Sequence, residues 1–155
     1  MSSGETIEIT LTDPQAAILN SNADRNLLMM GQGGGKTNTM GNLSYLLSQN
    51  VPDVMGLIAA NTYRQLTNST LKEIFKQWAS LGFTKYTEAN PSGSYVIDRT
   101  PPKTFTPHKY IFRDNDSKIY CKNGAVIVVA SLDNYMALEG MELGWALLDE
   151  TEATK

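Results

Sequence analysis

The sequence predicts an α/β fold with a mainly parallel sheet. Short apolar runs of strand length, such as residues 54–60, alternate along the chain with segments whose apolar residues recur at helical spacing, such as residues 70–81. Parallel strands need long connections, which are usually helices, so this alternation favours a parallel sheet covered by helices. The 155 residues, 41% of them hydrophobic and 19% charged, suffice for one globular domain.

The first predicted helix starts at Thr12-Asp13-Pro14-Gln15 and continues through Leu19. Asp13 can cap it, and Pro14 suits the first helical position, where a missing N–H costs nothing. A polar turn over residues 20–25 follows. The apolar run from Leu27 to Met30 is then predicted as a buried strand, because it has strand length and stops at a glycine-rich stretch.

Four of the five residues from 31 to 35 are glycine, and a lysine and a threonine follow at once. Beyond them four apolar residues recur at helical spacing: Met40, Leu43, Leu46 and Leu47. The predicted order is therefore strand, glycine loop, helix. In that context a glycine loop predicts a phosphate-binding site, with a flexible turn that happens to precede Lys-Thr as the alternative.

The physical reason is that glycines let successive backbone N–H groups converge on an anion, and the helix adds its own N–H groups and dipole. Lys36 would reach the β- and γ-phosphates, and the Thr37 hydroxyl would bind Mg²⁺. One position departs from the Walker A pattern, because Met30 stands where glycine is usual. The predicted Mg·ATP site consists of Gly31, Gln32, Gly33, Gly34, Gly35, Lys36 and Thr37.

The helix predicted over residues 70–81 has a capping box of Thr70 and Glu73, and Gly82 stands where it should end. Residues 83–116 lose the periodicity and are predicted as an irregular insertion with one or two short strands. His108 lies in this insertion without a partner motif, so it is predicted to be an ordinary surface residue.

Two strand-like runs flank Asn123-Gly124, which predicts a hairpin. Cys121, the single cysteine, is predicted to pack in the first of these strands. A last apolar strand runs into Asp149 and Glu150. Asp149 would hold Mg²⁺ through its water shell, and Glu150 would polarise the attacking water. The alternative is that these carboxylates form the solvated first turn of a helix.

These motifs, in this order, resemble the large subunits of phage terminases, the ATP-driven motors that pack DNA into capsids. The resemblance rests on "LTDPQAAIL", "LLMMGQGGGKT", "AANTYRQLTNSTLKEIFKQW" and "NGAVIVVASLDNYMALEGMELGWALLDE". It implies a P-loop NTPase of the RecA-like (ASCE) three-layer class with a mainly parallel sheet. Residues 1–155 would form the amino-terminal part of the ATPase domain, ending after the Walker B strand and without the nuclease domain.

The resemblance implies further roles. Gln15 would read the adenine, whose edge needs a donor and an acceptor; the alternative is that Gln15 only closes a capping box with Thr12. Arg64 would contact phosphate or DNA, or be a plain surface residue. The expected partners are double-stranded viral DNA, the portal protein, the small terminase subunit and further copies in a ring. The expected location is the host cytoplasm, transiently at the procapsid portal.

No membrane is expected among the partners. No apolar stretch approaches the ~20 residues that cross a bilayer, and the first residues lack the basic start and apolar run of a signal peptide. The formal net charge of −3 excludes a chain that is basic throughout.

Gln32 and Glu139 stand where many terminases carry an arginine. We therefore expect an ATPase that is weak or inactive as an isolated chain. Two alternatives stay open. A helicase-like P-loop motor would share the nucleotide motifs but would not explain "LEGMELGWALLDE". A nucleotide-binding module without turnover would explain the missing arginines.

Overall fold

The computed structural model describes residues 6, 8–28, 35–109 and 117–149. Their helices are α1 (Asp13–Leu19), α2 (Lys36–Asn50), α3 (Tyr63–Gln65), the π-helical turn η1 (Leu66–Thr70), α4 (Leu71–Ser80) and the 3₁₀ helix η2 (Leu132–Leu138). Their strands are β1 (Met55–Ala60), β2 (Tyr95–Ile97), β3 (Lys118–Cys121), β4 (Val126–Ser131) and β5 (Leu143–Asp149).

The five strands form one mixed sheet in the order β2-β3-β4-β1-β5. Strand β1 pairs in parallel with β4 on one side and with β5 on the other. Strands β2 and β3 add antiparallel, so the prediction of a mainly parallel sheet holds for the core of the sheet and not for its β2–β3 edge. All six residues of β1 are buried, as a central strand with both faces covered requires.

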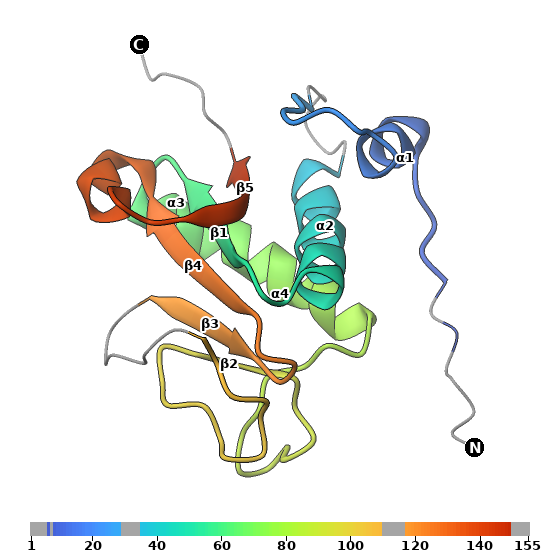
Figure 1. The fold of residues 1–155 in the computed structure, drawn as a ribbon. Coiled ribbons are helices and arrows are strands. Elements are labelled where there is room, and N and C mark those ends of the chain that lie inside the picture. The colour runs from blue at the N-terminus through green and yellow to red at the C-terminus, as the bar shows by residue number, and fades with distance from the viewer. Residues whose placement is uncertain (1–5, 7, 29–34, 110–116, 150–155) are drawn as a thin grey trace.

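Helices α2 and α4 cover one face of the sheet (Figure 1). There Met40 of α2 and Ile74 and Trp78 of α4 pack on Ile58 and Ile127 of the sheet. The opposite face is covered by the irregular chain around Phe105 and by η2, and not by a second layer of helices. Within the described residues, the helix–sheet–helix layering implied by the resemblance is thus met on one face only.

Helix α2 lies where it was predicted, but its most deeply buried side chains are mostly polar. Met40 is buried, whereas Leu43, Leu46 and Leu47 are only half-buried. The physical reason is a close approach of α4 at Gly41, where a Cβ would lie 2.7 Å from the Cβ of Gln77. Helices this close leave room for short side chains such as Ser44 and Ser48 on the shared face.

Three amide side chains form a closed ring of hydrogen bonds between α2 and α4. Asn38 donates to Gln77 at 2.6 Å, Gln77 donates to Asn42 at 2.7 Å, and Asn42 donates back to Asn38 at 3.3 Å. Asn42 is 1% exposed, so these bonds compensate the cost of burying its amide. The ring fixes the first turns of α2 against α4.

Helix α4 ends as predicted but does not begin as predicted. Gly82 has φ +76°, its N–H donates to Ala79, and the next N–H, of Phe83, donates to Trp78, which together form a Schellman motif. The prediction of a capping box at Thr70 is wrong, because Thr70 has helical backbone angles and its side chain makes no capping hydrogen bond. The helical segment begins upstream, where the Thr62 hydroxyl accepts the N–H of Gln65.

The predicted hairpin is confirmed: β3 and β4 are antiparallel and Gly124 has φ +95° at the turn. Cys121 packs in β3 as predicted, and complete burial raises the pKa of its thiol to about 12. Within its described residues, 83–109, the predicted irregular segment contains one short strand, β2, in line with the prediction of one or two. It is more than a surface insertion, since Tyr95, Val96 and Phe105 are buried in the core.

The strand predicted over Leu27–Met30 is not found in its described half. Leu27 and Leu28 belong to no strand, and Leu27 is 79% exposed. An apolar run forms a strand only where it can pair with the edge of a neighbouring strand. Two adjacent leucines do not indicate whether such a neighbour is present. Met29 and Met30 lie outside the described residues.

Candidate nucleotide-binding site

Gly35 is the N-cap residue of α2, and its left-handed backbone conformation favours glycine. Its φ is +78°, and a Cβ there would lie 2.9 Å from Nε2 of Gln15. The Gly35 carbonyl accepts three hydrogen bonds, from the N–H of Thr39, the hydroxyl of Thr39 and the amide of Gln15. The last residue of the glycine loop is therefore held firmly against both α1 and α2.

Gln15 brings α1 to this point. It is 5% exposed; its Nε2 donates to Gly35 at 3.2 Å, and its Oε1 accepts the N–H of Thr12 at 3.0 Å. The capping box with Thr12 is thus present, as one of the two predicted roles requires. A primary amide has two N–H groups and two acceptor lone pairs, and these two bonds use one of each.

Lys36 and Thr37 form the first turn of α2, and both are half-buried. The first N–H groups of a helix have no partner inside the helix, and they add to the positive end of its dipole. An anion at this end of α2 would therefore meet both backbone donors and the Lys36 ammonium group. Four predicted site residues lie outside the described residues: Gly31, Gln32, Gly33 and Gly34.

Asp149 ends strand β5 and is 7% exposed. Its Oδ2 accepts a hydrogen bond of 2.6 Å from the hydroxyl of Thr70, which is fully buried and 79 residues away in the chain. Sequence reasoning missed this partner, because it assigned the Thr70 hydroxyl to a helix cap. Glu150 lies outside the described residues.

The two halves of the predicted site lie at the same end of the sheet. Parallel pairing places Ala60, Ser131 and Asp149 side by side, where β1, β4 and β5 end. Figure 1 shows the first turn of α2 at that end, and α2 contacts β5 directly. Ligands of α/β sheets bind outside the carboxyl ends of the strands, so Lys36 and Asp149 stand where a ligand is expected.

The donor atoms present fit Mg²⁺. A hydroxyl from Thr37 and a carboxylate from Asp149 are hard oxygen ligands, and Mg²⁺ usually takes one or two carboxylates together with waters and phosphate oxygens. No group of three or more His, Cys, Asp or Glu side chains gathers among the described residues. Such an all-protein cage is typical of other metals and is not needed for Mg²⁺ bound with a nucleotide.

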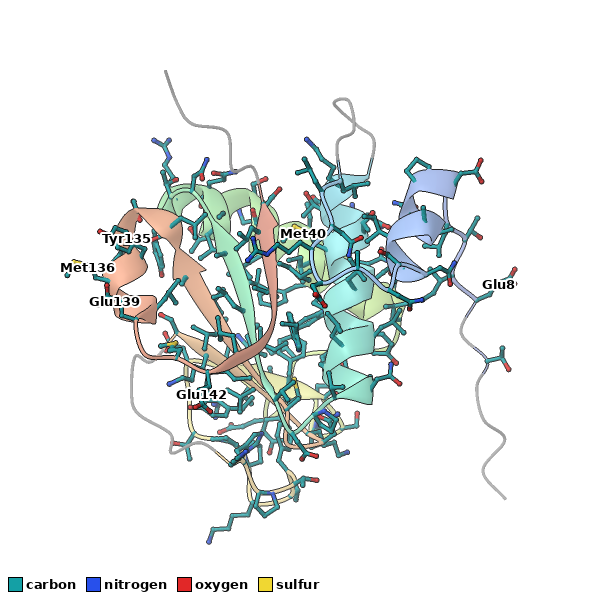
Figure 2. The ribbon with its side chains drawn as sticks, turned by 45° about the horizontal axis from the view of Figure 1, so that its top comes forward. Glu8, Met40, Tyr135, Met136, Glu139 and Glu142 are labelled. Carbon is teal, nitrogen blue, oxygen red and sulfur yellow. The ribbon has the colours of Figure 1, made fainter. Side chains whose placement is uncertain are left out.

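The described arginines Arg25, Arg64 and Arg99 are exposed. Arg64 lies in α3, just beyond the end of β1, and therefore at the same end of the sheet as Asp149. Glu139, which stands where many terminases carry an arginine, caps the end of η2. Figure 2 shows it beside Tyr135 and Met136, on the side of the sheet away from α2.

His108 is not the ordinary surface residue that was predicted. It is half-buried, its Nε2 donates to the carbonyl of Cys121 at 2.8 Å, and its ring meets Tyr120 edge-on with centroids 5.1 Å apart. Burial lowers the pKa of His108, and the hydrogen bond to Cys121 opposes that shift. The side chain anchors the segment after Pro107 to strand β3.

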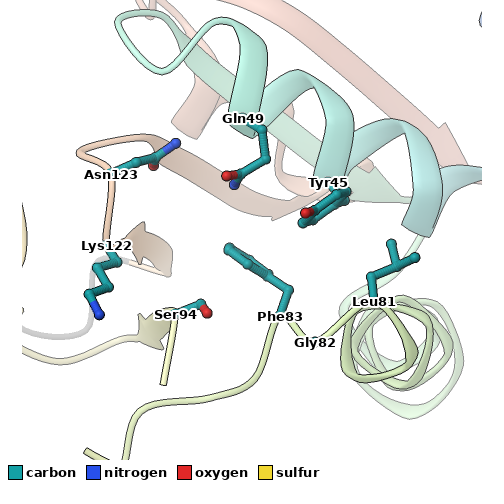
Figure 3. A pocket seen from close by; sticks show the side chains of 8 residues that line it. All are labelled: Tyr45, Gln49, Leu81, Gly82, Phe83, Ser94, Lys122 and Asn123. Carbon is teal, nitrogen blue, oxygen red and sulfur yellow. The ribbon is translucent and has the colours of Figure 1, made fainter. Parts of the chain in front are cut away.

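A cavity of about 310 Å³ lies away from the predicted site, between α2, the end of α4 and the β3–β4 hairpin (Figure 3). Tyr45 and Phe83 form its aromatic wall, and Lys122 and Asn123 border it at the hairpin. None of the described site residues lines it.

Comparison of the chain with protein-family models, with curated proteins and with solved structures gives no match. The site therefore has to be interpreted from its own residues. No helix in the described part of the chain is both long and apolar enough to span a bilayer.

Proposed function

We propose that this chain binds Mg·ATP through the glycine loop and the first turn of α2, as the amino-terminal part of a P-loop ATPase. The observation that carries the proposal is that Lys36, at the start of α2, and Asp149, at the end of β5, lie at the same end of the sheet. Gly35 joins them as a residue whose left-handed backbone favours glycine.

In this proposal each residue has one task. The backbone N–H groups of Gly31, Gln32, Gly33, Gly34 and Gly35 bind phosphate oxygens. Lys36 adds positive charge at the β- and γ-phosphates, and Gln15 offers its spare donor and acceptor to the adenine. Thr37 and Asp149 hold Mg²⁺, which when bound neutralises charge on the phosphates. Glu150 orients the attacking water as general base.

The wider proposal is that the chain belongs to the large subunit of a phage terminase and that ATP hydrolysis drives packaging of viral double-stranded DNA into a procapsid. It is supported by the order of the four sequence blocks and by the β3–β4 hairpin that precedes the acidic strand. Its partners would be the viral DNA, the portal protein, the small terminase subunit and further copies of the chain in the host cytoplasm.

A second candidate is a nucleotide-binding module without turnover. It is favoured by one observation, namely that Gln32 and Glu139 occupy positions where an activating arginine is common, while the described arginines are exposed. ATP binding without hydrolysis, both with and without DNA, would support this candidate over the motor.

Lys36→Ala tests the proposed site. It removes a charge-assisted contact to phosphate, so ATP affinity measured by calorimetry should fall by about 1.5–3 kcal/mol. Lys72→Ala is the matched control, since Lys72 is an exposed lysine of α4 and its loss changes the net charge equally. Equal ATP affinities of the Lys36→Ala and Lys72→Ala proteins would contradict the assignment.

A further inference from the structure

We propose that Thr70 is a positioning residue that orients Asp149 for Mg²⁺, an inference that rests on the nucleotide-binding function proposed above. The geometry behind it is the 2.6 Å hydrogen bond from the Thr70 hydroxyl to Oδ2 of Asp149. A bond of that length is typical of a hydroxyl that donates to an ionised carboxylate.

Thr70 stands on an otherwise apolar stripe. It lies four residues before Ile74 and eight before Trp78, and all three side chains are fully buried. An apolar residue at position 70 would continue this stripe, whereas a buried hydroxyl costs free energy unless it finds a partner. The partner of the Thr70 hydroxyl is Asp149, so this hydroxyl contributes a contact to the end of β5 and not to the apolar packing of α4.

The local backbone also points to a specific role. Thr70 is the last residue of the π-helical turn η1, which lies between α3 and α4. Single π turns are rare and occur frequently at functional sites, because the extra residue shifts the side chains that follow around the helix axis. Here the turn ends on the residue that contacts Asp149, and η1 itself contacts β1.

The bond restrains the carboxylate of Asp149, because the side chain cannot rotate without losing its donor. It uses one lone pair of Oδ2, so Oδ1 and the second lone pair of Oδ2 would remain for the water shell of Mg²⁺. Groups that orient a metal-binding side chain in this way commonly change metal affinity by 10–100-fold when they are removed. The expected effect of losing Thr70 is therefore on Mg²⁺ and not on ATP as such.

The test compares Thr70→Val, which keeps the shape and removes the donor, with Thr70→Ser, which keeps the donor. Thr67→Val is the matched control, because within the described part of the chain the Thr67 hydroxyl, in the same turn, bonds to the backbone of Tyr63 and Arg64 and not to Asp149. ATP binding is measured by calorimetry in EDTA and across a Mg²⁺ titration. For Thr70→Val we expect a rise of about tenfold in the Mg²⁺ concentration at which half of the Mg²⁺-dependent change in ATP binding has occurred. The ATP affinity in EDTA should be unchanged.

Thr70→Ser and Thr67→Val should both titrate like the unmodified protein. A Thr70→Val midpoint equal to the unmodified one, or an equal loss of affinity with and without Mg²⁺, would overturn the inference. If Thr70→Val does not fold, Thr70→Ala takes its place with the same criteria. Lys36→Ala separates the two proposals. If the unmodified protein does not bind ATP, or if Lys36→Ala leaves its ATP affinity unchanged, the nucleotide site is refuted, and the role of Thr70 is refuted with it.

Discussion

The side-chain amide of Gln15 donates to the carbonyl of Gly35, 20 residues further along the chain, over 3.2 Å. The same amide accepts the N–H of Thr12. One side chain thus closes the start of α1 and at the same time holds the last glycine of the loop at the start of α2. The position of α1 is therefore coupled to the start of α2 at Gly35.

Replacing Gln15 by alanine should weaken nucleotide binding by two routes. Loss of the hydrogen bond to Gly35 costs about 1 kcal/mol of loop positioning and lowers the affinities for ATP and GTP alike. Loss of the spare donor and acceptor should lower the affinity for ATP further. Calorimetry with both nucleotides separates the routes. Asn20→Ala is the control, because among the described residues the Asn20 side chain bonds to the backbone of Ala16 in its own helix. Equal losses for ATP and GTP would leave Gln15 as an anchor without adenine recognition.

Turnover by the isolated chain should be slow or absent. In the proposed site Glu150 would position the water, but an arginine that stabilises transition-state charge raises kcat roughly 10³–10⁵-fold. Neither Gln32 nor Glu139 supplies that charge. The measurement is steady-state phosphate release, with Glu150→Gln as the control. Brisk release that disappears in the Glu150→Gln protein would show that the chain completes its site unaided.

Gly56→Ala should destabilise the fold by about 1–3 kcal/mol, the usual cost of overpacking a core. Gly56 lies opposite Trp145 in the pairing of β1 with β5, and a Cβ at Gly56 would overlap the Trp145 ring. Urea unfolding measures the loss. The double variant Gly56→Ala, Trp145→Leu should lose less unfolding free energy than the two single variants lose together, because the smaller side chain at position 145 relieves the overlap. Strict additivity would contradict this packing.

His108 should titrate below the usual histidine range of about 6.5, because burial lowers its pKa. The unfolded chain then binds the proton more readily than the folded one, so this group leaves stability unchanged above pH 6.5 and reduces it as the pH falls below that value. As the sequence has one histidine, NMR can follow the ring directly. His108→Phe should remove this part of the pH dependence; a midpoint at or above 6.5 would contradict the prediction.

Features encoded by neighbouring residues could be predicted from the sequence. Gly82 ends α4 because a left-handed residue is needed there, and Asn123-Gly124 forms a hairpin because its turn needs positive φ. Both requirements act within a few residues. The alternation of strands and helices likewise gave the parallel core of β4, β1 and β5.

Features that depend on distant residues could not be predicted in this way. Thr70 carries a capping sequence, yet its hydroxyl bonds to Asp149, 79 residues away. His108 gains its partner in β3 only when the chain folds back. Leu27 looks like the start of a strand, but local sequence cannot say whether a strand edge will accept it. In each case tertiary contact decides between two locally reasonable outcomes.

The strand order also determines how long β1 exists on the ribosome before its partner strands are synthesised. Strand β1 is buried along its whole length, but both of its neighbours, β4 and β5, come from much later in the chain. The ribosome must add about 65 residues after β1 before β4 begins, which takes roughly 3–13 s at 5–20 residues per second. During that interval the apolar segment of β1 stays unpaired, so the nascent chain exposes a segment that chaperones can bind before the sheet forms.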